Sequence, residues 1–175
     1  MQQGAPPGRC NGRHREVGVG EGGTASLLNH HFPDRKLLLF DTFTGFDARD
    51  LARNEALGLG GAPYPLSPMS GETVLGRLPR PDRAELHRGW FPESAAGLED
   101  RRFALVHIDV GLYQPTYAAL GWFSGRVNRR GYILVADYAH RGTVGVGRAV
   151  RQHAEETGAS YVVLPDRAGT AVFAM

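Results

Sequence analysis

Three short apolar runs, each with an aspartate at or next to its end, constrain the fold of this chain most strongly. They are residues 37–41, 103–110 and 131–137, and their acids are Asp41, Asp109 and Asp137. A continuous apolar run of this length is typical of a parallel strand that is buried on both faces. Helical patterns lie between the runs, so the sequence predicts a doubly wound α/β sheet. In such a sheet ligands bind beyond the carboxyl ends of the strands.

The remaining segments complete this pattern as one domain over residues 15–175. We expect 1–14 to be a disordered lead-in, because it is rich in Gly, Pro and Arg and has no periodicity. A long variable loop is expected at about 44–84, with one helix near 48–57. Further strands are expected at 15–19 and 85–88, and helices at 24–31, 114–127 and 144–156. Two apolar segments at 161–164 and 170–174, separated by a Pro-Asp-Arg-Ala-Gly turn, predict a closing antiparallel β-hairpin.

Composition excludes several classes of protein. Of the 175 residues, 42% are apolar and 22% are charged, which excludes wholesale disorder and a coiled coil. No apolar run approaches the ~20 residues of a membrane helix and no signal peptide is apparent, so we expect a cytoplasmic protein. The single cysteine, Cys10, excludes an internal disulfide framework. Basic residues are spread along the chain without a stripe or aromatic platforms, which argues against nucleic-acid binding.

A glycine-rich segment follows the first expected strand and satisfies two ligand-binding templates. Gly18-x-Gly20-x-x-Gly23 matches the fingerprint of dinucleotide-binding proteins. Glu16-x-Gly18-x-Gly20-x-Gly22 matches the loop that cradles the methionine part of S-adenosylmethionine. In both cases glycine lets the backbone approach a ligand at the N-terminus of the following helix. On the residues alone both templates stay open, as does a loop that only turns tightly.

The three strand-end acids have different expected roles. Asp41 follows the glycine segment by one strand, where a carboxylate can accept both hydroxyl hydrogens of a ribose diol. Asp109 and Asp137 end two consecutive strands 28 residues apart, and a right-handed crossover makes such strands neighbours. Their carboxylates, with waters and substrate oxygens, would suit Mg²⁺. The alternative for each acid is to cap the following helix or turn. His107, inside a strand, is expected to be a hydrogen-bonded core residue rather than a base.

The closing hairpin and six longer segments point to one family. Nicotinamide-binding sheets usually stay parallel, whereas a terminal antiparallel hairpin is a habit of class I methyltransferases. The segments are EVGVGEGGTASLL, FPDRKLLLFDTFTGF, HRGWFPES, FALVHIDVGLYQPTYAAL, GYILVADYAHRGTVGVGRAV and LPDRAGTAVF. Together, over about 16–175, they resemble the macrocin/mycinamicin-type O-methyltransferases. The resemblance implies a Rossmann-like class I S-adenosylmethionine fold and a Mg²⁺ site that binds vicinal sugar hydroxyls.

The resemblance also implies roles for individual positions. The residues that would flank the methionine moiety are Glu16, Gly18, Gly20, Gly22 and Gly23, and those at the ribose are Asp41 and Thr42. Asp109 matches a metal ligand and candidate catalytic base, and Asp137 matches a second metal ligand. Gly111 and Ala136 stand where the family usually carries further acids, so this chain keeps two acids of the metal set.

These observations lead to one main hypothesis about function. The chain is expected to transfer a methyl group from S-adenosylmethionine to a hydroxyl of a small, sugar-bearing natural product, as in antibiotic biosynthesis, with help from Mg²⁺. An alternative is a truncated or degenerate methyltransferase fold that binds cofactor or a partner without catalysis. A third is an NAD(P)-binding oxidoreductase. No membrane partner is expected, and homo-oligomerisation stays open.

Overall fold

Seven strands form one sheet in the computed structural model, which describes residues 13–63 and 65–175. The strand order is β3-β2-β1-β4-β5-β7-β6. The strands are β1 (Arg13–Val17), β2 (Leu37–Asp41), β3 (Ala84–Arg88), β4 (Phe103–Ile108), β5 (Val127–Val135), β6 (Tyr161–Leu164) and β7 (Thr170–Ala174). The first five pair in parallel, while β7 runs antiparallel to both β5 and β6. The predicted class I methyltransferase fold, mostly parallel with a closing antiparallel hairpin, is confirmed.

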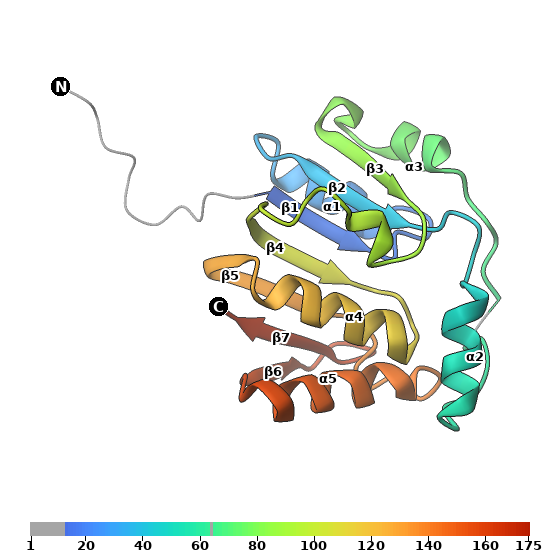
Figure 1. The fold of residues 1–175 in the computed structure, drawn as a ribbon. Helices are drawn as coiled ribbons and strands as arrows, with labels where there is room; N and C mark the ends of the chain where they lie inside the picture. The colour runs from blue at the N-terminus through green and yellow to red at the C-terminus, as the bar shows by residue number, and fades with distance from the viewer. Residues whose placement is uncertain (1–12, 64) are drawn as a thin grey trace.

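Helices cover both faces of the sheet and the edge at which the parallel strands end (Figure 1). They are α1 (Gly23–His31), α2 (Ala48–Ala56), α3 (Gly71–Arg77), α4 (Tyr113–Ser124) and α5 (Val144–Thr157). Helices α4 and α5 pack together on one face, and α1 lies on the other (Figure 1). Helix α2 lies beyond the carboxyl ends of the strands and contacts α4. Within the described part of the chain, no helix has the length and apolar character needed to cross a membrane.

Strand β2 shows why a continuous apolar run becomes a buried strand here. Successive side chains of a strand point to opposite faces of the sheet. Leu37 and Leu39 pack with Ala25 of α1, whereas Leu38 and Phe40 join the core under α4. All four β2 side chains are 2% exposed or less. Only the last residue of the strand, Asp41, emerges from this double-sided core, so the fold delivers an acid to the sheet edge.

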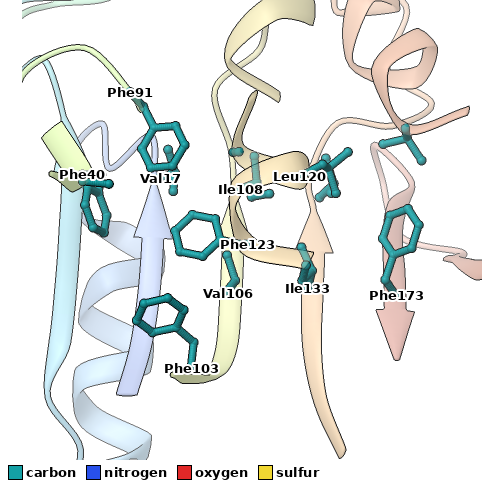
Figure 2. Close-up of a cluster of buried hydrophobic side chains, with 14 of the residues drawn as sticks. Val17, Phe40, Phe91, Phe103, Val106, Ile108, Leu120, Phe123, Ile133 and Phe173 are labelled. Atoms are coloured by element: carbon teal, nitrogen blue, oxygen red, sulfur yellow. The ribbon is translucent and has the colours of Figure 1, made fainter. Parts of the chain in front are cut away.

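Phe123 of α4 is at the centre of the larger core (Figure 2). Its ring stacks on Phe91 with the centroids 5.5 Å apart. It also meets the edge of Phe103, at a centroid distance of 5.4 Å, and of Phe40, at 6.3 Å. Phe91 follows β3, Phe40 lies on β2 and Phe103 begins β4. This cluster therefore fixes α4 against three strands and positions the turn that follows β3.

The structure corrects the predicted start of the domain. Strand β1 already begins at Arg13, so the lead-in expected to end at residue 14 contributes two residues to the sheet. His14 pairs with Leu37 of β2, which explains why order begins earlier than composition indicated. Residues 1–12 lie outside the described residues. The strand ends at Val17 rather than at 19, because Gly18 leaves the extended conformation with a φ of 82°.

Two boundaries around α4 and β5 also differ from the prediction. Helix α4 ends at Ser124 rather than near 127, because Gly125 caps it. Strand β5 then begins at Val127 rather than at 131, with a register irregularity in its pairing with β4. It ends at Val135, so Asp137 lies two residues beyond the strand that was expected to contain it.

The expected long loop at about 44–84 contains more structure than predicted. Helix α2 agrees with the helix predicted near 48–57. Helix α3 is an additional element that the prolines and glycines of this region obscured. It begins after Ser70, whose hydroxyl oxygen accepts a hydrogen bond from the Thr73 amide at 3.2 Å, a regular N-cap arrangement. The described residues between α2 and α3, 57–63 and 65–70, form no helix or strand.

Replacing Phe123 with alanine tests the importance of this aromatic cluster. Because the side chain is fully buried among four other aromatic rings, we expect F123A to lower the free energy of unfolding by about 3–5 kcal/mol. The control is V162A on β6, where the side chain is 63% exposed and a loss below about 1 kcal/mol is expected. Urea denaturation measures both, and equal losses would contradict the assignment of this core.

Candidate active site

A cavity of about 350 Å³ opens at the carboxyl ends of the parallel strands. The segments that follow β1, β2, β3 and β4 all contribute to its walls, together with Asp50 of α2 and residues 66–69 of the long loop. Of the predicted site residues, Glu16, Gly18, Gly20, Gly23, Asp41, Thr42 and Asp109 line it, whereas Gly22 and Asp137 do not. The fold thus brings most, but not all, of the predicted residues to one place.

Gly18 occupies the tightest position of the glycine segment. Its φ of 82° is left-handed, and a Cβ atom built on it would lie 2.0 Å from the Asp109 carbonyl oxygen. The backbones that follow β1 and β4 therefore meet at Gly18, and only glycine permits this approach. Gly22 has another role, because a Cβ there would lie 3.0 Å from the Val74 side chain of α3. Gly20 and Gly23 face open space and leave room in the cavity.

The carboxylate of Asp41 ties the glycine segment to β2. One oxygen, Oδ2, accepts hydrogen bonds from the Val19 amide at 2.7 Å and the Gly20 amide at 3.1 Å. The other, Oδ1, accepts one from the Phe43 amide at 2.8 Å. The Thr42 hydroxyl also lies 3.4 Å from Oδ1, but its single proton is shared with the closer Gly45 carbonyl oxygen. A carboxylate offers about four lone-pair sites, so acceptor capacity remains on Oδ1. Asp41 is thus neither a solvated acid nor a helix cap. It organises the loop and still faces the cavity.

Glu16, which lines the cavity, pairs with His107, which does not. The distance between Glu16 Oε1 and His107 Nδ1 is 3.3 Å, and Glu16 is only 1% exposed. Burial raises the pKa of Glu16 above its ordinary value. Burial opposes protonation of His107, but Glu16, Asp109 and Asp137 together outweigh it and raise the pKa of His107. The imidazole does not line the cavity, in keeping with the predicted core role.

Asp109 and Asp137 do not enter the cavity together. Strands β4 and β5 are parallel neighbours as predicted, and Asp109 lines the cavity. Burial raises the pKa of the Asp109 carboxyl, His107 partly opposes this shift, and Asp137 adds to it. Asp137 lies in a turn with a φ of 60°, outside the cavity walls, where its carbonyl oxygen accepts a hydrogen bond from the Thr143 hydroxyl at 3.0 Å. The two acids are close enough to interact electrostatically but occupy different surroundings.

Few side chains at the carboxyl ends of the parallel strands could bind a metal ion. Across residues 13–63 and 65–175, no group of three or more His, Cys, Asp or Glu side chains could hold a metal. Two carboxylates, Asp109 and Asp137, remain, and of these only Asp109 lines the cavity. Mg²⁺ commonly keeps several waters and takes only one or two protein carboxylates. The two carboxylates are within that number, so a magnesium ion at this edge stays a proposal.

Two cavity residues carry polar groups that sequence reasoning did not single out. Asp50 of α2 is 5% exposed, and its Oδ2 accepts a hydrogen bond from the Trp90 indole Nε1 at 3.0 Å. Burial raises the pKa of Asp50 to about 6. The sequence gives no signal for this acid, because the helix ARDLARNEA looks like an ordinary charged, solvated helix. Trp90 is visible in the sequence only as part of an aromatic turn.

Comparison with known proteins assigns the family. The model of the macrocin-O-methyltransferase (TylF) family matches residues 8–161. The chain belongs to the macrocin O-methyltransferase family. This O-methyltransferase membership agrees with the resemblance found in the sequence, and it favours the S-adenosylmethionine template over the dinucleotide fingerprint for the glycine segment. A search of curated proteins finds no match.

Several solved structures share the fold of this macrocin O-methyltransferase family member. The calicheamicin methyltransferase CalS11, described as a TDP-rhamnose 3'-O-methyltransferase, superposes with a TM-score of 0.70 at 24% identity, covering 94% of this chain and 72% of that one. The O-methyltransferase NovP gives 0.70 at 21% identity with the same coverage. Cofactor-bound Rv0187 from MTB gives 0.65 at 18%, covering 93% and 72%. At these identities the likeness establishes the shared fold.

Alanine substitutions at two glycines test how the loop is built. In G18A the new Cβ would collide with the Asp109 backbone, which cannot move without disrupting β4, so a loss above about 3 kcal/mol of unfolding free energy is expected. The matched control is G20A, which has a φ of 52° but open space around the position, so only about 1 kcal/mol should be lost. Denaturant unfolding measures the free energy of unfolding of both variants. A G18A protein as stable as G20A would contradict the close approach of the two backbones.

Proposed function

We propose that this protein transfers a methyl group from S-adenosylmethionine to a hydroxyl on the sugar of a small natural product. The observation that carries the proposal is the cavity itself, in which a glycine segment, the acid that ends β2 and a partly buried acid after β4 face one space. Family membership supports methyl transfer to oxygen. The sugar acceptor is proposed because CalS11, a fold neighbour, is described as acting on TDP-rhamnose.

The glycine segment and Asp41 would bind the methyl donor. The amino-acid part would lie along the backbone of the glycine segment near the start of α1, where amide groups and the helix N-terminus favour a carboxylate. The remaining lone pair on Asp41 Oδ1 would accept a hydrogen bond from a ribose hydroxyl, with the Thr42 side chain beside it. The donor supplies a methyl group on a positively charged sulfur, and the acids that line the cavity favour that charge.

Asp109 would receive the proton of the acceptor hydroxyl. Its carboxylate lines the cavity and is largely shielded from water, and burial raises its pKa, which makes it a better base than an exposed aspartate. As the oxygen–hydrogen bond breaks toward Asp109, the hydroxyl oxygen forms a bond to the methyl carbon and the carbon–sulfur bond breaks. The products are the methyl ether, S-adenosylhomocysteine and a protonated Asp109 that returns its proton to water.

Asp109 and Asp137 would also hold Mg²⁺ in this proposal. A bound Mg²⁺ lowers the pKa of a coordinated hydroxyl and orients it. The two carboxylates would supply the negative charge for the ion, while waters and acceptor oxygens complete the shell. Gly111 and Ala136 offer no side-chain ligands, so we expect weaker magnesium binding than a site with three or four acids would show.

A second candidate function rests on that same shortage of acids. A protein that lacks ligands at Gly111 and Ala136 could bind the cofactor without catalysis, as a degenerate member of the fold. This candidate predicts normal binding of S-adenosylhomocysteine and no turnover with any acceptor, with or without Mg²⁺. Turnover of even one sugar acceptor would remove it.

Binding of S-adenosylhomocysteine is the first test. Calorimetric titration should give a micromolar dissociation constant for the wild type, and D41N should weaken it at least about tenfold, because a charged acceptor is lost and the new amide opposes the loop amides. The control is D34N, the same change at an exposed acid outside the cavity, which should bind as the wild type does. A folded wild type that fails to bind would contradict the proposal.

Turnover tests the role of Asp109. Conversion of S-adenosylmethionine is followed with a panel of sugar nucleotides that includes TDP-rhamnose, with Mg²⁺ or with EDTA. D109N should lower turnover at least about 100-fold and still bind S-adenosylhomocysteine within about twofold of the wild type. D137N should raise the Mg²⁺ concentration needed for half-maximal rate. Loss of cofactor binding in D109N would indicate misfolding, and a rate unchanged by EDTA would contradict the magnesium site.

A further inference from the structure

The outermost strand of the described sheet, β6, has one edge that is not paired with another strand. β6 pairs with β7 on its other side, because it is the last strand in the sheet order. Its residues Val162, Val163 and Leu164 are 63%, 43% and 42% exposed. Soluble proteins usually protect such an edge with charged side chains or proline. The strand itself, Tyr-Val-Val-Leu, contains neither, so its edge is open to pairing.

Two charged side chains of α5 lie toward this edge. Burial and the Tyr138 hydroxyl, 2.9 Å away, raise the pKa of Tyr161 on β6 to about 12. Arg151 lowers this pKa and Glu155 raises it, so both side chains lie near the start of β6. They are four residues apart, which places them on one side of the helix. Figure 1 shows α5 along the same border of the sheet as β6.

The order of these two charges is opposite to the order that an isolated helix favours. Acidic side chains stabilise the N-terminal end of a helix, and basic side chains stabilise the C-terminal end. In α5 the last turn contains Glu155 and no base, and Arg151 precedes it. Among the described residues, neither side chain forms a salt bridge. An antiparallel neighbouring helix with the same order of charges would place an acid beside Arg151 and a base beside Glu155.

The residues before β1 are a poor match for this apolar edge. Residues 1–12 read MQQGAPPGRCNG and contain one large apolar side chain, Met1. They join the sheet at β1, which is separated from β6 by β4, β5 and β7. The same edge of a second copy is a better match, because two identical strands can pair antiparallel about a two-fold axis. No like charges would meet along the paired strands, since β6 contains no charged residue.

A two-fold axis through the middle of β6 also brings the charges of α5 together. Helix α5 and β6 are joined by the short segment 158–160. A strand rises about 3.3 Å per residue and a helix about 1.5 Å, so the middle of β6 lies level with a point about three residues back from the end of α5. Since α5 ends at Thr157, this point lies between Arg151 and Glu155. Rotation about the axis therefore places Arg151 of each copy opposite the partner's Glu155.

We propose that β6 and α5 form the interface of a homodimer, in which the two β6 strands pair antiparallel and Arg151 of each copy forms an ion pair with the partner's Glu155. A stable interface buries about 800 Å² per partner, more than a short strand pair supplies, so the two α5 helices contribute the rest. β5 and β7 separate β6 from the strands whose ends form the cavity, so both cavities stay open in the dimer. This inference does not depend on the proposed function.

The mass of the protein in solution tests the strand pairing. Sedimentation equilibrium of the wild type should give twice the chain mass of 19.0 kDa, with a dissociation constant in the micromolar range. V162K places a charge on both paired strands and should raise the dissociation constant at least about tenfold. The matched control is L27K on α1, where the apolar side chain is 60% exposed, and it should keep the wild-type value.

Exchange of the two α5 charges tests the helix contact. R151E sets acid against acid across the axis and should weaken the dimer about tenfold, because two ion pairs are lost and repulsion replaces them. The double variant R151E/E155R restores opposite charges and should return the dissociation constant to within about twofold of the wild type. A change that only altered the stability of one chain would not be reversed in this way.

Three results would overturn the proposal. They are a wild type that stays monomeric up to about 100 µM, a dimer that V162K does not weaken, and a double variant as weak as R151E. Circular dichroism and urea denaturation show whether each variant is folded. If V162K fails to fold, the two helix variants still decide, because they change exposed side chains outside the sheet.

Discussion

Three backbone amides converge on the carboxylate of Asp41, and the geometry of the cavity depends on this convergence. Val19 and Gly20 follow β1, whereas Phe43 follows β2, so a single side chain fixes two loops relative to one another. Without it, the amides of the glycine segment would lack acceptors and the left-handed glycines would have nothing to hold their conformation. An acid at the end of β2 is therefore structural before any ligand arrives, and its spare acceptor capacity is what a ligand can use.

Negative charge gathers at the same edge of the sheet. Glu16, Asp50 and Asp109 are all shielded from water, and burial raises the pKa of each carboxyl. Acids with shifted pKa values concentrate at functional sites, where ligand binding can offset the free-energy cost of burying them. A cationic sulfur and a divalent ion are both ligands that this edge favours electrostatically. The chemistry proposed here follows from that charge more than from any single contact.

The sequence predicts the scaffold of the site better than its walls. Strands β2 and β4 are apolar enough to be identified outright, and each delivers its acid where parallel strands must end. The glycine segment predicts a close backbone approach, although Gly22 packs on Val74 rather than facing the cavity. The sequence predicts that Asp137 ends a strand, which is wrong because β5 already ends at Val135. Asp50 could not be predicted, because its burial depends on how α2 folds back over the strand ends.

The sheet order makes β6 dependent on a strand that follows it in the chain. β6 pairs with β7, and β7 in turn separates it from β5, so β6 has no place in the sheet until β7 has formed. During synthesis, Val162, Val163 and Leu164 leave the ribosome before their partner strand. Even in the finished fold these three side chains stay exposed, on the outermost strand. A nascent chain that contains β6 but not yet β7 would expose an apolar, unpaired strand. Such strands bind chaperones and promote aggregation.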